Sequence, residues 1–560
     1  MADPAPVLRP WLASYPPGCR WDAPILPGTI GGLLDHAIAR WADRPALEYR
    51  GHVVTYATLG AAVRRLAAGL LSLGVTPGTP VGLLLPNTPW HPVCFLALAK
   101  LGARVVHLSP LDARRVLHHK LTDSGARIVV TTDLPGMLAT ALDLLDAGIA
   151  GRVLLGEDAA WGDEAAGAGE RDPRAIPLST LGAGLPEPAW PNVSPGDIAL
   201  LQYTGGTTGL PKGAMLTHAN LTATVEIYRY WQDGGVLAEG EQRVMGVLPL
   251  FHIYALSSVL LRHLACGNEI LLRPRFDAGA ALHDIAERRV TVMPGVPTMW
   301  IALLNHPDAH GTDFSSLRAC ISGGAPLPFE VGAKVEALLG QRLHIGWGMT
   351  ETSPAGTRVP VAATLRPGII GVPLPGVDLR IVALDDPSRP LPPGEAGEIA
   401  IRGPNVFAGY LNQPAETTAA FRDGWFLTGD IGRMEADGLF FLMDRRKNMI
   451  ISGGFNVYPA AIEGAIYEHP DVAEVVVIGI PDSYRGQSAK AFVTLRDGAP
   501  ELTLDALKSF LRDRLGRHEM PAALELRTEL PRSPAGKLLA SALVAEEMAH
   551  RAALNESHSP

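Results

Sequence analysis

Residues 92–131 read PVCFLALAKLGARVVHLSPLDARRVLHHKLTDSGARIVVT, and the fold class follows from the pattern in this segment. Apolar residues spaced three and four apart predict helices over Pro92–Leu101 and Ala113–Ser124. Short apolar runs predict strands over Val105–Leu108 and Ile128–Thr131. Helices and strands that take turns in this way are typical of crossover units around a mostly parallel sheet, so the segment predicts an α/β architecture.

The same alternation extends toward the N-terminus, and a second, smaller pattern closes the chain. Helices are expected over Leu33–Trp41 and Leu59–Leu73, followed by a strand over Val81–Leu85. After a charged cluster around Lys447, we expect a helix over Ala460–Glu468, strands over Val472–Ile478 and Ala489–Leu495, and a helix over Leu504–Leu515. We therefore predict a large domain over residues 1–446 and a small α+β domain over residues 447–560.

Composition limits the class of protein. Hydrophobic residues make up 47% of the 560 residues and charged residues 19%, so the chain is expected to fold around large cores. A net charge of −9 disfavours a nucleic-acid partner. The four cysteines lack metal-ligand spacing, and the N-terminus lacks the pattern of a signal peptide. The apolar span Val244–Leu261 contains Pro249 and His252, which argues against a membrane helix. We expect a cytoplasmic protein.

Residues 203–213, YTGGTTGLPKG, form the densest functional signal in the chain. The glycines and threonines offer backbone N–H groups and hydroxyls in one turn, and Lys212 adds a cation, which together suit a phosphate group. A plain surface turn is the alternative, and one of only eight lysines beside four glycines and three threonines disfavours it. Pro211 precedes Lys212 and Gly213 follows it, so the spacing excludes a P-loop NTPase.

Four further segments carry polar groups in turns, and each is a weak signal by itself. They are residues 321–326 (ISGGAP), 346–354 (GWGMTETSP), 424–432 (GWFLTGDIG) and 532–538 (RSPAGKL). Trp347 offers an aromatic face for adenine, and Glu351 offers a carboxylate to a metal ion or phosphate site. Asp430 can accept ribose hydroxyls, although aspartate is also ordinary in turns. For Lys537, a solvated surface residue is the alternative interpretation.

Together these motifs resemble the ordered signatures of the adenylate-forming superfamily, which includes acyl-CoA synthetases, luciferases and peptide-synthetase adenylation domains. The resemblance rests on YTGGTTGLPKG, GWGMTE, GWFLTGD, DRRKNMIISGGFNVYP (residues 444–459) and PRSPAGKL, and it covers about Leu33–Leu539. It implies a large N-terminal domain of β-sheets flanked by helices and a small hinged α+β C-terminal domain. The chain is most similar to a medium- to long-chain fatty acid–CoA ligase, which forms acyl-AMP and pyrophosphate from Mg-ATP and then acyl-CoA and AMP.

The resemblance implies a nucleotide site spread over several motifs. The matching positions are Thr204, Gly205, Gly206, Thr207, Thr208, Gly209, Lys212, Gly323, Gly324, Ala325, Trp347, Gly348, Met349, Asp430 and Arg445. Trp347 stands where the family usually has tyrosine, and its indole is still expected to stack on adenine. Asp430 and Arg445 match the pair that contacts the ribose. Mg²⁺ is implied with ATP, and Thr204 and Glu351 match its protein ligands.

The resemblance also implies catalytic and hinge residues. Lys537 matches the lysine that bridges the carboxylate and the α-phosphate during adenylation, and Glu351 and Thr350 match the other catalytic positions. Lys447 matches the hinge about which the small domain turns. A hinge suits this chemistry, because an ammonium left beside the adenylate would obstruct the thiol in the second half-reaction.

The acyl group and CoA, the implied co-substrate, have four candidate residues: His252, Val296, Gly453 and Gly454. His252 lies in LPLFHIYAL (residues 248–256), which resembles the segment at the carboxylate end of the acyl pocket; a buried histidine bonded to the backbone is the alternative. No charged residue falls between Val244 and Leu261, which favours an aliphatic tail over an amino acid. A medium- to long-chain fatty acid is the first choice. The second is a dicarboxylic acid whose distal carboxylate is received by Arg262 or another nearby arginine.

The sequence leaves other activities possible. The acyl group could pass to a carrier protein instead of CoA, and a luciferase-type monooxygenase is a distant alternative. A non-catalytic nucleotide-binding module is disfavoured because Lys537 and Glu351 are both present. The expected partners are a fatty acid, ATP and CoA, with no nucleic acid, while a homodimer and peripheral membrane contact stay open. The other lysines are expected on the surface: Lys100, Lys120, Lys334, Lys490 and Lys508.

Overall fold

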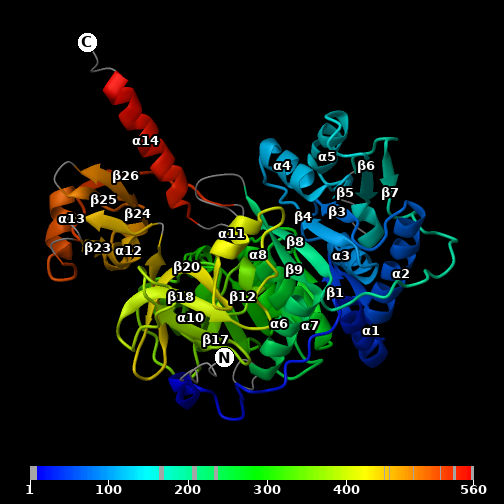
Figure 1. Ribbon diagram of the computed structural model, residues 1–560, viewed down its shortest axis with the longest axis horizontal. Coiled ribbons are helices and arrows are strands. Elements are labelled where there is room, and N and C mark those ends of the chain that lie inside the picture. The colour runs from blue at the N-terminus through cyan, green and yellow to red at the C-terminus, as the bar shows by residue number, and fades with distance from the viewer. Residues whose placement is uncertain are drawn as a thin grey trace.

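The computed structural model describes residues 9–162, 169–204, 211–231, 237–446, 448–452, 455–482, 485–516, 519–533 and 538–556. Three sheets organise these residues, two in a large N-terminal part and one in a small C-terminal part (Figure 1). Within the described ranges, no helix is both long enough and apolar enough to cross a membrane.

The first sheet arises from the alternating segment that opens the sequence. Its strands lie in the order β7 (Ala175–Pro177), β6 (Arg152–Gly156), β5 (Ile128–Thr132), β3 (Pro80–Leu83), β4 (Arg104–His107), β8 (Ile198–Thr204) and β9 (Lys212–Thr217). All neighbouring pairs are parallel except β8 and β9, which pair antiparallel. The parallel strands are almost continuously apolar because helices cover both faces of the sheet.

The second sheet joins a parallel half to an antiparallel half. Its strands lie in the order β17 (Asp378–Val382), β18 (Ala396–Arg402), β20 (Trp425–Met434), β21 (Phe440–Arg445), β16 (Ile369–Pro373), β15 (Thr357–Arg358), β14 (Leu343–Trp347), β13 (Ala319–Ser322), β12 (Val292–Gly295), β10 (Arg243–Gly246), β11 (Glu269–Leu272), β1 (Pro45–Tyr49) and β2 (His52–Thr55), and β19 (Phe421–Arg422) pairs with β20. The strand direction reverses between β14 and β15, which pair antiparallel. The parallel strands β13 and β14 therefore end beside this change.

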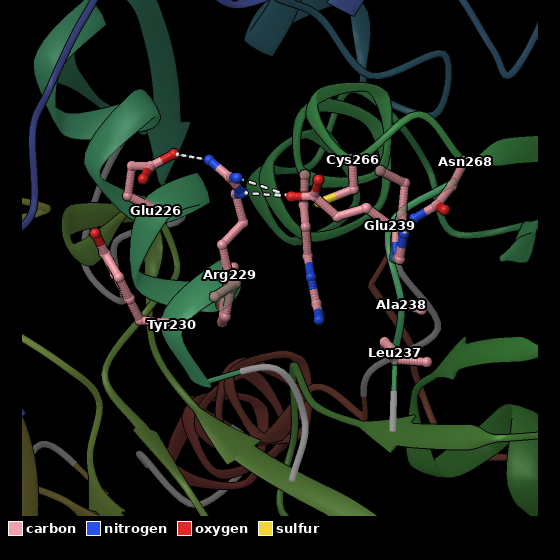
Figure 2. Close-up of a pocket in the computed structure, with 11 residues that line it drawn as sticks. Glu226, Arg229, Tyr230, Leu237, Ala238, Glu239, Cys266 and Asn268 are labelled. Atoms are coloured by element: carbon pink, nitrogen blue, oxygen red, sulfur yellow. Dashed lines mark hydrogen bonds and ion pairs between the residues drawn. The ribbon is translucent and has the colours of Figure 1, made fainter. Parts of the chain in front are cut away.

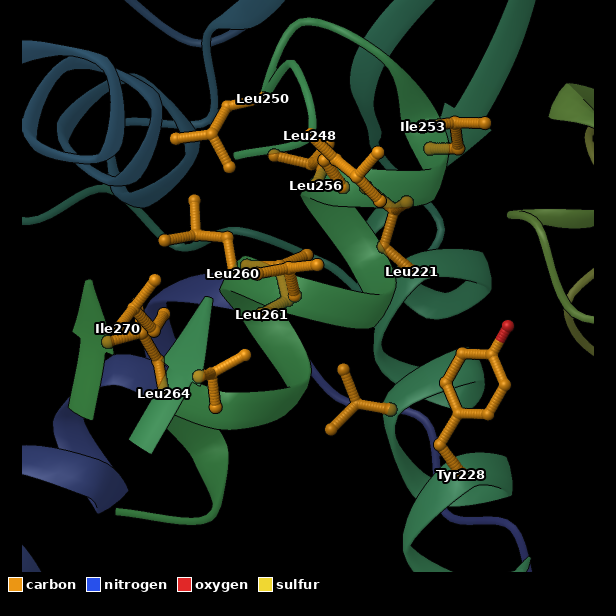
Figure 3. Packing of buried hydrophobic residues seen from close by; sticks show 14 of the residues in the cluster. Leu221, Tyr228, Leu248, Leu250, Ile253, Leu256, Leu260, Leu261, Leu264 and Ile270 are labelled. Atoms are coloured by element: carbon orange, nitrogen blue, oxygen red, sulfur yellow. The ribbon is translucent and has the colours of Figure 1, made fainter. Parts of the chain in front are cut away.

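Helices fill the space around these two sheets. They are α1 (Ile30–Trp41), α2 (Tyr56–Ser72), α3 (Trp90–Lys100), α4 (Arg114–Ser124), α5 (Met137–Asp146), α6 (His218–Trp231), α7 (Arg262–Ala265), α8 (Ala278–Glu287), α9 (Pro297–Leu304), α10 (Phe329–Leu339) and α11 (Pro414–Ala419), with 3₁₀ turns η1 (Pro10–Ser14), η2 (Asp158–Trp161), η5 (Ala309–Gly311) and η6 (Thr350–Thr352). A π-helix, η4 (Ala255–Leu261), precedes α7 and is buried along its whole length. Leucines from η4 and its surroundings form a dense core, with Tyr228 of α6 at its border (Figure 3).

A smaller sheet lies in the C-terminal part. Its strands lie in the order β23 (Phe455–Val457), β22 (Ile450–Ser452), β25 (Gly486–Leu495) and β24 (Val472–Asp482), with β26 (Ala523–Leu526) beside β25. The helices α12 (Pro459–Tyr467), α13 (Leu504–Leu511) and α14 (Ala540–Glu556) accompany it. Its apolar side chains form their own core, separate from the large one. The small part has the core of an independent folding unit.

The structure confirms the predicted fold class. The large sheets flanked by helices and the small α+β C-terminal domain are both present. Lys447, the predicted boundary and hinge, lies outside the described residues. One surface prediction is wrong: Lys120 is only 6% exposed. Its ammonium pairs with a carboxylate and lies 5.9 Å from the centroid of the Tyr203 ring, so a charge that looked like a solvated helix residue is buried.

Candidate active site

The candidate site is a cavity of about 400 Å³ between the two large sheets. Four of its lining residues end parallel strands: His107 ends β4, Thr204 ends β8, Ser322 ends β13 and Trp347 ends β14. Ligand sites in α/β folds lie at the carboxyl ends of strands, since loops leave the sheet there and backbone groups are free to bind. The fold thus brings four strand ends from two sheets to one cavity.

Many of the residues predicted from sequence line this cavity. They are Thr204, His252, Gly323, Gly324, Trp347, Gly348, Met349, Thr350, Glu351 and Arg445. Lys212, Ala325, Val296 and Asp430 are described but do not line it; Lys212 contacts Glu416 at 2.5 Å, and Val296 packs against Gly324. The remaining predicted residues lie outside the described ranges: Gly205, Gly206, Thr207, Thr208, Gly209, Lys447, Gly453, Gly454 and Lys537.

Trp347, Asp430 and Arg445 form one connected unit. The indole Nε1 of Trp347 donates to Asp430 Oδ2 at 2.8 Å, and Arg445 Nε contacts Asp430 Oδ1 at 2.5 Å. Asp430 and Arg445 face each other across β20 and β21, so the sheet register fixes this pair. The indole packs on Gly356, where a Cβ would come within 2.5 Å of the ring. The unit presents an aromatic surface, a carboxylate and a guanidinium beside one another.

Two glycines of the cavity loops cannot be replaced by a residue with a side chain, one because another backbone atom lies too close and one because of its backbone conformation. A Cβ on Gly348 would come 1.5 Å from the carbonyl oxygen of Pro354, so no side chain fits there. Gly324 has a φ of +78°, a left-handed conformation that glycine adopts at little cost. The loops that follow β13 and β14 can therefore run close to the cavity and expose their backbone groups to a ligand.

Glu351 is a buried carboxylate at the cavity wall. It is 5% exposed, and its Oε1 accepts a 2.9 Å hydrogen bond from the Tyr410 hydroxyl. Burial raises the pKa of Glu351, while the bond from Tyr410 lowers it. No cluster of three or more histidine, cysteine or acidic side chains suited to a metal ion occurs in the described part of the chain. Thr204 and Glu351 nevertheless bring a hydroxyl and a carboxylate to the same cavity, and Mg²⁺ prefers such oxygen donors with waters and phosphates completing its shell.

Two histidines from different elements meet at the cavity. The Nδ1 of His107 pairs with Gln202 Oε1 at 2.8 Å, and burial lowers the pKa of His107 to about 4. The Nδ1 of His252 accepts from the backbone N–H of Tyr254 at 3.3 Å, which places the proton of the neutral ring on Nε2. His107 is thus neutral near pH 7, and both histidines line the cavity.

Sequence reasoning missed a buried ion pair beside the phosphate motif. Lys120 Nζ contacts Asp112 Oδ2 at 2.5 Å, and both residues line the cavity. The helix that carries Lys120 also supports both ends of the motif: Tyr203 Oη donates to Asp123 at 2.7 Å, and His119 Nε2 contacts the carbonyl of Pro211 at 2.8 Å. The available signal was an aspartate in the short loop between β4 and α4, and its separation of eight residues from Lys120 concealed the pair.

The small domain reaches the cavity as well. Ser533 lines it and directly precedes the segment 534–537, which lies outside the described residues. Asp444, near the end of β21, accepts a 2.8 Å hydrogen bond from the N–H of Ala460 in the first turn of α12. The carboxylate of Asp444 therefore links the last strand of the large domain to the first helix of the small one.

The arrangement suits a nucleotide and an acid held in one cavity. Trp347, Arg445, Glu351 and Thr204 line the same space as His252, Tyr254 and the glycines after β13. No serine or cysteine nucleophile is needed, since a bound carboxylate can itself attack a phosphate when charge is neutralised around it.

Family models match most of the chain. Residues 34–411 match the model described as AMP-binding enzyme, and residues 461–537 match AMP-binding enzyme C-terminal domain. A long-chain-fatty-acid–CoA ligase of Bacillus subtilis is 36% identical, over 96% of this chain and 98% of that protein. A feruloyl-CoA synthase of Amycolatopsis is 38% identical, over 88% and 94%.

Solved structures show the same fold. The ATP-bound structure of MatB from Rhodopseudomonas palustris matches with a TM-score of 0.82 and 30% identity, over 93% of this chain and 99% of that one. The o-succinylbenzoate CoA synthetase of Bacillus subtilis, in complex with its acyl-adenylate, matches with a TM-score of 0.78 and 28% identity, over 91% and 97%. The likeness therefore extends over both domains.

Proposed function

The chain belongs to the AMP-binding enzyme family and is an ATP-dependent, AMP-forming acid–CoA ligase, and on this premise we propose that it activates a medium- to long-chain fatty acid. The observation that supports this function most directly is the shared cavity, which Thr204, Trp347 and Glu351 line together with His252 and Tyr254. The named fatty acid–CoA ligase among its relatives, aligned over nearly the whole chain, supports the same choice.

The first half-reaction joins the acid to AMP. A carboxylate oxygen attacks the α-phosphorus of ATP, the bond to the β-phosphate oxygen breaks, and acyl-AMP and pyrophosphate result. In our proposal Trp347 stacks on adenine, and Asp430 and Arg445 hold the ribose. The N–H of His252 and the backbone after β13 orient the carboxylate. Holding both reactants in one cavity supplies much of the rate enhancement, because it removes the entropy cost of their encounter.

Mg²⁺ fits the oxygen donors present. We propose that Thr204 and Glu351 hold the ion that accompanies ATP, since both line the cavity and Glu351 is anchored by Tyr410. The bound ion supplies positive charge that neutralises the phosphates. The raised pKa of Glu351 matters here, because only the carboxylate form is a ligand.

Lys537 supplies the second cation in this proposal. It follows Ser533 by four residues, and Ser533 lines the cavity, which supports this role. A compact ammonium on a flexible stem can enter such a site and leave it again more readily than a guanidinium fork.

The second half-reaction forms the thioester. The CoA thiol gives up its proton and attacks the acyl carbon, and the acyl–phosphate bond breaks to release AMP. We propose that the small domain turns about Lys447, that Lys537 leaves, and that Gly453 and Gly454 then line the path of the thiol. The contact from Asp444 to Ala460 belongs to the arrangement seen here and would have to break in such a movement.

Measuring the two half-reactions separately tests the role of Lys537. In Lys537→Ala, fatty acid-dependent pyrophosphate release should fall by at least about a hundredfold, while thioester formation from supplied acyl-AMP and CoA should be kept. Lys334→Ala, an exposed lysine of the large domain, is the matched control. Equal loss of both half-reactions would refute the role given to Lys537.

A panel of acids and acceptors tests the substrates. Saturated acids of increasing length, with CoA or an acyl carrier protein as acceptor, should give the highest kcat/KM for a medium or long chain with CoA. Preference for the carrier protein, or for short-chain acids, would contradict the proposal. A cytoplasmic location, a homodimer and peripheral membrane contact remain predictions beside it.

A further inference from the structure

Asp123, in the last turn of α4, joins two distant segments of the large domain although it does not itself line the cavity. Its Oδ2 accepts a 2.7 Å hydrogen bond from the Tyr203 hydroxyl, and its Oδ1 accepts one of 3.2 Å from the side-chain amide of Asn412. The Asn412 amide also donates to the backbone carbonyl oxygen of Asp123 at 2.9 Å. Both carboxylate oxygens are therefore used, and each holds a different segment of the chain.

Both segments lead into the proposed nucleotide site. Tyr203 directly precedes Thr204, which ends β8 and lines the cavity. Asn412 lies two residues after Tyr410, whose hydroxyl donates to Glu351 Oε1 at 2.9 Å. Thr204 and Glu351 are the two oxygen donors that the proposed function assigns to Mg²⁺. The carboxylate on α4 is thus linked to one donor through β8 and to the other through Tyr410.

The backbone on both sides of Tyr410 is held in place. Backbone hydrogen bonds of 2.8 to 2.9 Å join residues 408–411 to residues 213–215 of β9. Asn412, the next residue, has a φ of +55°, a left-handed conformation that asparagine adopts more readily than most residues. Its two hydrogen bonds to Asp123 favour this conformation. We therefore expect a displacement of Asp123 to reach Tyr410.

A second side chain on the same face of α4 contacts the other strand of the hairpin. His119 lies four residues before Asp123, and residues at this spacing share one face of a helix. The Nε2 of His119 donates to the carbonyl oxygen of Pro211 at 2.8 Å. Thr204 and Lys212 pair across β8 and β9, so α4 contacts both strands close to the end of this pair.

An aspartate suits this position better than a neutral residue. Hydrogen bonds to an ionised acceptor are stronger than those between neutral groups, and a carboxylate can accept from two donors at once. A ligand site needs its contacting side chains held to within about 0.5 Å by the residues behind them. Asp123 meets this requirement for two segments together.

We propose that Asp123 is a positioning residue for Mg-ATP: without touching the ligand, it holds Thr204 and the Tyr410–Glu351 pair at a fixed separation. His119 supports the same arrangement by fixing the residue that precedes β9. The inference rests on the proposed function, because it takes Thr204 and Glu351 as the residues that meet ATP and its metal ion. Affinity for ATP then depends on a residue outside the cavity, while the chemistry of the acyl group does not.

The test compares Mg-ATP binding with a reaction that does not use ATP. In calorimetry without fatty acid, the Kd for Mg-ATP should rise at least about tenfold in Asp123→Ala, which loses both side-chain hydrogen bonds. Asp123→Asn keeps one acceptor oxygen, so the rise should be smaller, about threefold. Thioester formation from supplied acyl-AMP and CoA should stay within about twofold of wild type in both variants, because acyl-AMP carries neither the β- nor the γ-phosphate.

Asn412→Gly tests the link to Tyr410 without changing the carboxylate. Glycine suits the left-handed backbone at this position, so the variant removes the amide and leaves the turn. The Kd for Mg-ATP should rise about threefold. The double variant with Asp123→Ala should bind Mg-ATP no more weakly than Asp123→Ala alone, because both changes remove the same contact. Asn412→Gly also keeps the proposal testable if Asp123→Ala folds poorly.

Glu226→Gln is the control for general destabilisation. Glu226 and Glu239 both contact Arg229 at 2.8 Å beside a second cavity of about 160 Å³, and neither glutamate lines the cavity of the candidate site (Figure 2). Its Kd for Mg-ATP should equal that of wild type even if its melting temperature falls as far as that of Asp123→Ala.

Three results would each refute the positioning role. They are an unchanged Kd for Mg-ATP in both Asp123→Ala and Asn412→Gly, an equal loss of ATP binding and of thioester formation, and a rise in Kd of the same size in Glu226→Gln. In each case the ligase assignment stands if wild type releases pyrophosphate with a fatty acid. If wild type neither binds Mg-ATP nor releases pyrophosphate, the proposed function itself fails.

Discussion

The indole Nε1 of Trp347 donates a 2.8 Å hydrogen bond to Asp430 Oδ2, and Asp430 is held from its other side by Arg445 at 2.5 Å. An aromatic platform and a ribose-type carboxylate are thereby fixed relative to each other. A phenylalanine could stack but could not make this bond, and a tyrosine would place its hydroxyl elsewhere. The position of Asp430 thus depends on the residue type at 347.

Trp347→Phe should weaken ATP binding without removing activity. The ring remains, but Asp430 loses a donor, and a hydrogen bond to a charged acceptor contributes enough for an effect of about tenfold. The expected change is a rise in KM for ATP of about that size, with KM for the acid unchanged, measured by ATP–pyrophosphate exchange. A similar rise for Trp11→Phe, a core tryptophan near Phe440, would show that the effect is general destabilisation.

Tyr410→Phe should shift the pH dependence of adenylation. Burial raises the pKa of Glu351, and the Tyr410 hydroxyl opposes that rise, so the variant should raise the pKa further. Since metal binding needs the carboxylate, the acid limb of the pH–rate profile should move to higher pH. The pH dependence of stability should have the opposite sign to that of activity. A carboxyl group whose pKa is raised in the folded protein stabilises the fold at low pH, where it is protonated, and this contribution to the free energy of unfolding is lost as pH increases.

Glu351→Gln tests whether Glu351 is the group that sets the acid limb of the pH–rate profile. The variant cannot titrate, so its residual activity should lose the acid limb altogether, and its dependence on Mg²⁺ concentration should weaken. An unchanged acid limb in both variants would mean that another group controls it.

Lys120→Met should destabilise the large domain. The substitution removes the cation that pairs with the carboxylate of Asp112 in a largely buried site. An unpaired charge in such a site typically lowers the free energy of unfolding by about 3 kcal/mol. Urea unfolding should show this loss, and the double variant Lys120→Met with Asp112→Leu should recover most of it. Lys334→Met, on the exposed face of α10, should change the free energy of unfolding by less than about 0.5 kcal/mol.

Asp444→Ala should alter the balance between the half-reactions. It removes the acceptor for the Ala460 N–H and so weakens the domain arrangement in which Ser533 lines the cavity. Adenylation should slow severalfold, while thioester formation from supplied acyl-AMP should be unchanged or faster. Asp444→Asn keeps an acceptor oxygen and should lie near wild type; if it behaves like the alanine variant, charge rather than the hydrogen bond matters.

Much of the fold could be predicted because it depends on local pattern. The helix at Pro92–Leu101 and the strand at Val105–Leu108 differ from the observed α3 and β4 by at most two residues at either end. Lys120 was misplaced because helical spacing shows which face a residue occupies but not what covers that face. Its carboxylate partner is eight residues away in sequence, beyond the three- or four-residue spacing of helical pairs.

The amino-acid sequence alone determined the class of this protein: an α/β chain with a glycine- and threonine-rich motif and the ordered signatures of one family. These are properties of periodicity and of short motifs, in which neighbouring residues act together. Only the tertiary structure decided which distant side chains share a space. Tyr228, Arg262 and Arg358 come from α6, α7 and β15, and the fold brings the Cζ atoms of the two arginines to 5.4 and 5.7 Å from the centroid of the Tyr228 ring. No local pattern encodes such long-range contacts.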